Sequence, residues 1–220
     1  MPLQSIEIET AQNPSHAVIW LHGLGADGHD FEPIVPQLVD RSWPALRFVF
    51  PHAPVRPITI NGGMAMRAWY DISGLEIAQR QDEAGIRASI RLLGELVERE
   101  VARGVAAKDI LVAGFSQGGA IVLAGGIRYG QRLGGIVALS TYLPMAEKTD
   151  AEMSAANRDL PIFMAHGTLD PTISHALGQM SRDYLQQRGY VVDWHAYPMA
   201  HQVCMEEIAD LRRWMSARLT

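Results

Sequence analysis

The sequence has little cysteine, no excess of positive charge and no long hydrophobic run, and each of these absences excludes a class of protein. The single cysteine, Cys204, has no partner for a disulfide within the chain, which is typical of proteins in a reducing compartment. A formal net charge of −5 offers no basic surface for nucleic acid or for an anionic membrane. No uninterrupted apolar stretch approaches the roughly 18 residues that span a bilayer.

The remaining composition is that of a folded globular protein. Apolar residues make up 48% of the chain and charged residues 20%. The first ten residues, MPLQSIEIET, have neither a positively charged start nor an apolar segment, so we expect no secretory signal. The 220 residues suffice for one domain with its own core, and we find no repeat or linker. These features predict a single domain, 1–220, located in the cytoplasm and without integral membrane association.

Strand and helix patterns alternate along the whole chain. Short apolar runs bounded by Gly, Pro or Ser predict buried strands at 17–23, 46–50, 110–115, 135–140, 161–167 and 191–198, and residues 3–10 suggest an additional edge strand. Helical periodicity and capping residues predict helices at 82–104, 174–189 and about 202–218. This alternation is typical of an α/β fold, with a mostly parallel central sheet and helices on both faces. Two long segments, 51–81 and 141–160, are expected to be irregular covers, too short for a lid domain.

The sequence GFSQG places Ser116 between a predicted strand and a predicted helix. Gly114, Ser116 and Gly118 form the pattern G-x-S-x-G, in which a tight turn raises the serine hydroxyl above the sheet. The glycines are needed because a Cβ at either position would collide with neighbouring backbone. The helix that follows directs its positive end toward developing negative charge. The pattern therefore indicates a nucleophilic serine, although an ordinary turn that happens to contain Ser has the same letters.

A serine nucleophile requires a base and a residue that orients the base. Asp170 follows the strand at 161–167, and His201 follows the strand at 191–198, so both lie at the edge of the sheet that carries Ser116. The order Ser, Asp, His is that of the α/β-hydrolase triad. We therefore predict that His201 takes the proton of Ser116 and that Asp170 orients His201. Taken singly, the aspartate could serve a turn, and the histidine could be a surface residue.

A metal site is the alternative use of these side chains. His166 and Asp170 lie four residues apart and could bind a metal together with His195 or His201. The segment between them is a turn and not one helix face, and the chain has no tight cluster of His and Cys. We therefore expect no metal and no cofactor. The other histidines and Cys204 are interpreted as structural.

The stretch HGLGADG, at 22–28, fits two kinds of anion site. Its spacing G-x-G-x-x-G resembles a dinucleotide-binding turn, but that site needs an acidic residue after the second strand, where this chain has Pro51 and His52. A serine hydrolase instead needs two backbone N–H groups for the oxyanion. Gln117, the residue after the nucleophile, supplies one, and Leu24 in the glycine loop is the candidate for the other.

With these motifs together, the chain resembles the carboxylesterase / acyl-protein thioesterase family of α/β-hydrolases. The resemblance extends over nearly the whole chain, through LHGLGADGHDF, FPHAPVRPITINGGMAMRAWYDI, GFSQGGAIVLAGG, LSTYLP, MAHGTLDPTI and YPMAHQVCMEEI. It implies a single-domain α/β-hydrolase without a large lid domain, acting on carboxylic esters and often on thioesters of acylated proteins or on lysophospholipids. By this resemblance Ser116, Asp170 and His201 form the triad, and Leu24 and Gln117 form the oxyanion hole. Many members of the family are homodimers, and the residues of this chain do not decide that point.

The long segments supply candidates for an acyl groove beside the triad. The candidates are the large apolar side chains of these segments: Met64, Met66, Trp69, Leu75 and Met145. We expect some of them to contact substrate, although a structural role in holding the segments to the core is equally compatible with each. The leading hypothesis is a serine hydrolase that cleaves esters of short to medium acyl chains through an acyl-enzyme. An amidase or peptidase with the same triad, a non-catalytic binding protein of the same fold and a dinucleotide-dependent oxidoreductase are the alternatives.

Overall fold

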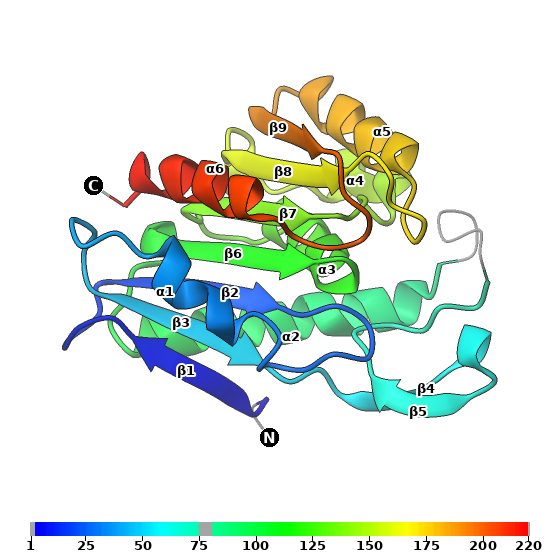
Figure 1. The fold of residues 1–220 in the computed structure, drawn as a ribbon, viewed down its shortest axis with the longest axis horizontal. Helices are drawn as coiled ribbons and strands as arrows, with labels where there is room; N and C mark the ends of the chain where they lie inside the picture. Colours follow the sequence, from blue (N-terminus) through cyan, green and yellow to red (C-terminus); the bar gives the residue numbers. More distant parts are fainter. Residues whose placement is uncertain (1–2, 75–80, 220) are drawn as a thin grey trace.

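The computed structural model describes residues 3–74 and 81–219, and its centre is a seven-stranded sheet in the order β1-β3-β2-β6-β7-β8-β9 (Figure 1). The strands of this sheet are β1 (Ser5–Glu9), β2 (His16–Leu21), β3 (Leu46–Pro51), β6 (Ile110–Phe115), β7 (Gly135–Leu139), β8 (Ile162–Gly167) and β9 (Val192–Tyr197). β1 is antiparallel to β3, and all other neighbouring pairs are parallel. The prediction of a mostly parallel sheet with an edge strand is confirmed.

Helices cover both faces of the sheet, as predicted. α1 (Val35–Leu38) and α6 (Met205–Ser216) pack on one face, and α2 (Glu83–Ala102), α3 (Gln117–Gly126) and α5 (His175–Gln186) pack on the other (Figure 1). The side chains of β2 alternate between the two layers: Val18 and Trp20 join the core under α1 and α6, and Ala17 and Ile19 join the opposite core. Because both faces are buried, the strands read as continuous apolar runs.

The three predicted helices are present, and the starts of two of them agree with the prediction. Asp82 caps α2 by accepting a hydrogen bond from the Gly85 N–H, and Ser174 caps α5 in the same way. Gly104 and Gly189, with φ of 98° and 86°, follow the ends of α2 and α5. The last helix begins at Met205 rather than at about 202, because the chain first makes the tight turn that carries the predicted base.

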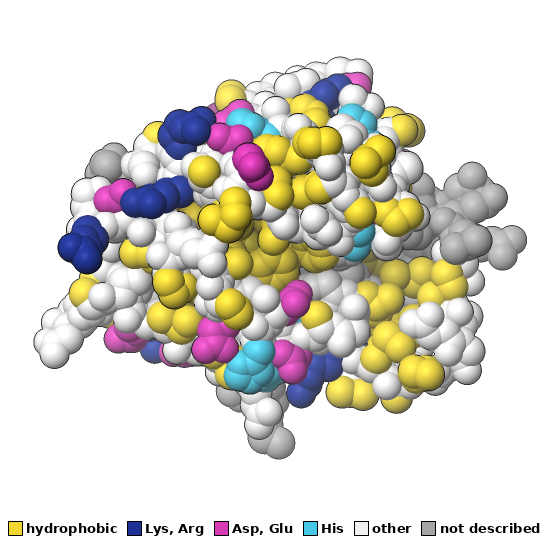
Figure 2. Space-filling model, viewed as in Figure 1, with side chains coloured by type: hydrophobic (Ala, Val, Ile, Leu, Met, Phe, Trp, Pro, Cys, Tyr) yellow, Lys and Arg dark blue, Asp and Glu magenta, His cyan; other side chains and the backbone are white. Residues whose placement is uncertain are grey.

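The segment 51–81 is not wholly irregular. β4 (Val55–Ile58) and β5 (Met64–Arg67) form a separate two-stranded antiparallel sheet, closed by a 3-10 turn at Thr59–Asn61. Hydrophobic side chains gather over this hairpin at the lower right of Figure 2. Val55 in β4 and Met64 in β5 have exposed fractions of 63% and 64%. Each strand has only four residues, β4 contains Pro57, and Ile58 is the one buried side chain of the pair, so the pattern is too short to predict a strand from the sequence.

The connection after β7 is also built from short elements. Residues 141–160 contain 3-10 turns at Ala146–Lys148 and Ala155–Asn157 on either side of α4 (Thr149–Glu152), and they form no separate lid. Further 3-10 turns lie at Glu32–Ile34 and Ala107–Asp109. Within the described residues, no helix combines the length and the apolar character needed to cross a membrane.

Candidate active site

Ser116 occupies a sharp turn between β6 and α3. Its φ and ψ are 54° and −118°, a backbone conformation that a residue with a side chain rarely adopts. A Cβ on Gly114 would lie 2.5 Å from the backbone of Gly118, and a Cβ on Gly118 would lie 2.3 Å from the Leu21 carbonyl oxygen. Both glycines of the G-x-S-x-G pattern are therefore required by close backbone contacts. The turn that results presents the serine hydroxyl at the carboxyl edge of the sheet.

The structure brings Ser116, Asp170 and His201 together from the ends of three strands. His201 Nε2 lies 2.8 Å from Ser116 Oγ, and His201 Nδ1 lies 2.7 Å from Asp170 Oδ2. With the imidazole proton on Nδ1, the serine hydroxyl donates to Nε2 and Nδ1–H donates to the carboxylate. The Asp170 side chain is buried, while 17% of the His201 side chain is exposed. This arrangement can move a proton from Ser116 to His201.

The turn that carries Asp170 is held by hydrogen bonds at both carboxylate oxygens. Oδ1 accepts from the N–H groups of Thr172 and Ile173 at 2.8 and 2.9 Å. His166, at the end of β8, lies beneath the turn, and its Nε2–H donates to the Ile173 carbonyl at 2.8 Å. The same Nε2 is 3.5 Å from Asp170 Oδ2. Burial lowers the pKa of His166, so the ring is neutral and acts as a fixed donor.

The glycine loop after β2 lies beside the serine turn. Leu24, Ser116 and Gln117 line the same pocket, and Gly25 has a φ of 78° that favours glycine. The backbone N–H of Gln117, the first residue of α3, has no acceptor within its own helix. Both residues predicted to supply oxyanion donors thus line the pocket that contains Ser116, and Gln117 lies at the positive end of the α3 dipole.

His22 anchors the start of this loop. Its Nδ1–H donates to the Gly23 carbonyl at 2.7 Å, and its Nε2 accepts from the Ala53 N–H at 3.0 Å. Burial lowers the pKa of His22 to about 4, so the ring is neutral near pH 7 and makes both bonds at once. The loop that carries Leu24 is thereby joined to the segment after β3.

The pocket beside Ser116 is small and mostly apolar, with a volume of about 50 Å³. Its walls are formed by Leu24, Tyr70, Ile72, Ser116, Gln117, Tyr142, Thr172 and Ile173. The hydroxyls of Tyr70 and Tyr142 are hydrogen-bonded to each other at 3.0 Å. Burial raises the pKa of Tyr142 to about 12, so this hydroxyl stays protonated. The pocket therefore offers an apolar wall for an acyl group next to the serine.

The predicted acyl-groove residues are mostly placed elsewhere. Trp69 and Met145 are buried in the core and do not line this pocket. Met64 is exposed on the hairpin. The sulfur of Met66 lies close to the glycine loop, since a Cβ built on Gly25 would be 3.9 Å from it. Leu75 lies outside the described residues. The apolar pocket walls come instead from Leu24, from two tyrosines and from two isoleucines.

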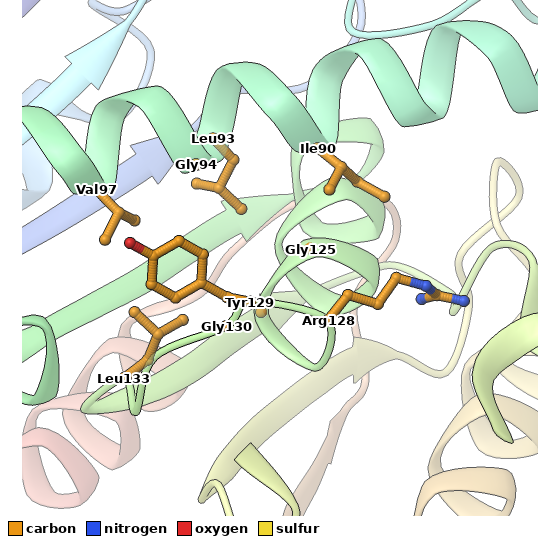
Figure 3. Close-up of a pocket in the computed structure, with 10 residues that line it drawn as sticks. Ile90, Leu93, Gly94, Val97, Gly125, Arg128, Tyr129, Gly130 and Leu133 are labelled. Atoms are coloured by element: carbon orange, nitrogen blue, oxygen red, sulfur yellow. The ribbon is translucent and has the colours of Figure 1, made fainter. Parts of the chain in front are cut away.

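A second cavity, of about 130 Å³, lies between α2 and α3 (Figure 3). Ile90, Leu93, Val97 and Leu133 give it apolar walls. Its polar side chains are already engaged, since Arg128 pairs with Glu152 and the hydroxyl of Tyr129 donates to Glu98. Nor do the described residues include any group of three or more His, Cys, Asp or Glu that could hold a metal ion. The pocket at Ser116 is thus lined by a serine whose hydroxyl is hydrogen-bonded to His201, and the residues that line the α2–α3 cavity offer no such pair.

Sequence reasoning did not identify His22, or the role of His166, as supports of the site. Both residues are the His of a His-Gly pair at the carboxyl end of a buried strand: His22 directly follows β2, and His166 is the penultimate residue of β8. That repeated position was the available signal. Both pairs lie at the carboxyl edge of the sheet, where loops must be fixed by side chains because the strand ladder has ended.

Comparison with known proteins agrees with the site. Residues 3–219 match the phospholipase/carboxylesterase family. Acyl-protein thioesterase 1 of Neurospora crassa is 41% identical over 212 residues, which cover 92% of this chain and 86% of the relative. Acyl-protein thioesterase 1 of Cryptococcus neoformans is 36% identical over 234 aligned positions, covering 99% of this chain and 98% of the relative. Among solved structures, that of Arabidopsis thaliana SOBER1 has a TM-score of 0.88 at 29% identity, covering 93% of this chain and 99% of that one. The chain therefore belongs to the phospholipase/carboxylesterase family of α/β-hydrolases, whose members hydrolyse esters.

Proposed function

We propose that this protein is a serine hydrolase that cleaves carboxylic esters of short to medium acyl chains through an acyl-enzyme on Ser116. The observation that carries the proposal is the position of His201 between the serine and a carboxylate. Its two ring nitrogens lie 2.8 Å from Ser116 Oγ and 2.7 Å from Asp170 Oδ2. Both distances are within the reach that proton transfer and orientation require.

In the proposed reaction, Ser116 Oγ attacks the carbonyl carbon of the ester while its proton moves to His201 Nε2. The carbonyl oxygen becomes an oxyanion and accepts hydrogen bonds from the N–H groups of Leu24 and Gln117. When the tetrahedral intermediate collapses, the bond to the leaving oxygen or sulfur breaks, and His201 gives that atom its proton. Water then attacks the acyl-enzyme in the same way, releasing the acid and restoring Ser116. Asp170 stabilises the imidazolium in both halves.

The surroundings of the site support acylated substrates. The small apolar pocket next to Ser116 suits an acyl group, and the exposed β4–β5 hairpin borders the site because the Gly25 N–H donates to the Arg67 carbonyl at 2.9 Å. Two relatives are named acyl-protein thioesterases, so thioesters of acylated proteins are substrates to test, as are lysophospholipids. We place the reaction in the cytoplasm, in agreement with the single cysteine. All triad residues come from one chain, so a homodimer is not needed to complete the site.

A fluorophosphonate probe tests the proposal directly. We expect one covalent adduct, located on Ser116 by mass spectrometry, and its loss in Ser116→Ala and His201→Ala. Ser42→Ala, which removes an exposed hydroxyl far from the triad in the sequence, is the matched control and should label like the unaltered protein. An adduct elsewhere, or labelling that survives His201→Ala, would refute the triad.

The bond that is cleaved requires a substrate panel. We expect turnover of p-nitrophenyl acetate and butyrate and of S-acyl thioesters, with little turnover of the matching anilides. Turnover of the anilides at comparable kcat/KM would instead indicate the amidase alternative. Labelling without turnover of any of these substrates would favour the non-catalytic alternative.

A further inference from the structure

Trp69 is fully buried, and its two N–H groups bond to two different parts of the active site. Its backbone N–H donates to Gln117 Oε1 at 2.7 Å, and its indole Nε1–H donates to the His22 carbonyl at 2.9 Å. Its own carbonyl accepts from the hydroxyl of Ser89, on α2. The indole ring also lies against the His22 imidazole, with centroids 5.4 Å apart.

These contacts reach one residue that carries a proposed oxyanion donor, Gln117, and the start of the loop that carries the other. The His22 carbonyl belongs to the peptide unit immediately before the one that contains the Leu24 N–H. The Gln117 side chain belongs to the residue whose backbone N–H is the other donor, and its Nε2 donates to the carbonyl of Tyr70 at 2.7 Å. Trp69 therefore connects the glycine loop to the serine turn through hydrogen bonds on both sides.

The spacing of the two donors needs such a connection. Leu24 and Gln117 lie on separate segments, 93 positions apart in the sequence. The end of β2 already contacts the serine turn, since a Cβ on Gly118 would meet the carbonyl oxygens of Leu21 and His22 at 2.3 and 2.6 Å. The loop after His22 leaves the strand ladder and is held instead by the bond from the Gly25 N–H to the Arg67 carbonyl and by the side-chain hydrogen bonds of His22 and Trp69.

We propose that Trp69 is a positioning residue that holds the Leu24 and Gln117 N–H groups at the separation required by the oxyanion. The proposal rests on the proposed function, because it concerns the same tetrahedral intermediate. Trp69 does not line the pocket, so it acts through the donors and not through substrate contact. A change at Trp69 should therefore weaken stabilisation of the transition state and leave substrate binding nearly intact.

The test removes the indole N–H while keeping an aromatic ring. Trp69→Phe removes the donor, and incorporation of 3-benzothienylalanine at position 69 removes it with almost no change in shape. We expect kcat to fall about 10- to 100-fold in both, since loss of a whole oxyanion donor costs roughly 10²–10³. KM should stay within about twofold, and the inhibition constant of a trifluoromethyl ketone, which forms a tetrahedral adduct on serine, should rise by the same factor as kcat/KM falls.

Trp43 provides the matched control. It is also buried, and its Nε1–H donates to Ser216 Oγ at 2.9 Å, but it belongs to the core under α1 and α6. The same two replacements at Trp43 should leave kcat and the inhibition constant within about twofold. If the Trp69 replacements behave like those at Trp43, or if they raise KM at unchanged kcat, the positioning role is refuted. The unaltered protein distinguishes this result from a failure of the proposed function. If it is labelled on Ser116 and hydrolyses esters, only the role of Trp69 is refuted. If it does neither, the proposed function itself is refuted.

Discussion

Glu207 is buried in the first turn of α6, and this burial makes stability depend on pH. Its side chain has no exposed surface, and burial raises its pKa from 4.5 to about 8, an effect that the nearby Cys204 backbone offsets only in part. The folded protein therefore keeps the carboxyl protonated near pH 7, whereas the unfolded chain ionises it. Folding takes up a proton between these pKa values, so this group's contribution to stability is complete below pH 4.5 and is lost as pH rises toward 8.

Glu207→Gln replaces the neutral carboxyl by a neutral group of the same shape. Since one pKa unit corresponds to about 1.4 kcal/mol, the pH-dependent cost of Glu207 is about 1 kcal/mol at pH 5 and about 4 kcal/mol at pH 8. The variant carries no such cost. The free energy of unfolding of the variant minus that of the unaltered protein should therefore increase by about 3 kcal/mol from pH 5 to pH 8.

Urea unfolding, followed by circular dichroism at pH 5, 6, 7 and 8, measures this difference. Burying the amide of the variant adds the same free energy at every pH. This contribution cancels, because the test compares the stability difference between the two proteins at one pH with that at another. Glu206→Gln, an exposed neighbour in the same helical turn, is the control and should show a difference of less than about 0.5 kcal/mol that does not grow with pH. A Glu207→Gln difference that stays constant across this range would refute the buried neutral carboxyl.

Two further predictions concern the supports of the active site. Gly118→Ala places a Cβ 2.3 Å from the Leu21 carbonyl oxygen, so we expect fluorophosphonate labelling to slow at least tenfold, measured on the folded fraction; labelling at the original rate would contradict the proposed backbone contact. His166→Gln keeps an N–H donor for the turn of Asp170 and should retain kcat/KM within about threefold, whereas His166→Leu should lose about tenfold or more. Equal losses in both variants would mean that His166 acts by packing alone.

The sequence predicted the parts of the site that depend on local patterns. Apolar runs located the strands because both sheet faces are buried, and the glycines around Ser116 revealed a turn that only small residues permit. Chain order then placed Asp170 and His201 at the same edge. The hairpin was missed because its strands are short and one contains a proline, and the pocket walls were missed because they combine residues from distant segments. Trp69 shows this most clearly, since its indole bonds a carbonyl 47 positions away, and the apolar side chain suggested substrate contact instead.

The histidines show why residue type alone could not separate chemistry from support. His22 and His166 direct their bonded ring nitrogens toward backbone groups, and burial keeps both rings neutral, so they fix loops. His195 lies between two carboxylates, at 3.0 and 3.3 Å, and has no hydroxyl to activate. His201 has a carboxylate on one nitrogen and the hydroxyl of Ser116 on the other. A base needs that asymmetry, because one nitrogen must be held while the other accepts a proton. The fold decides which groups contact each imidazole. His201 is therefore assigned as the base because its Nδ1 is bonded to a carboxylate and its Nε2 to a hydroxyl.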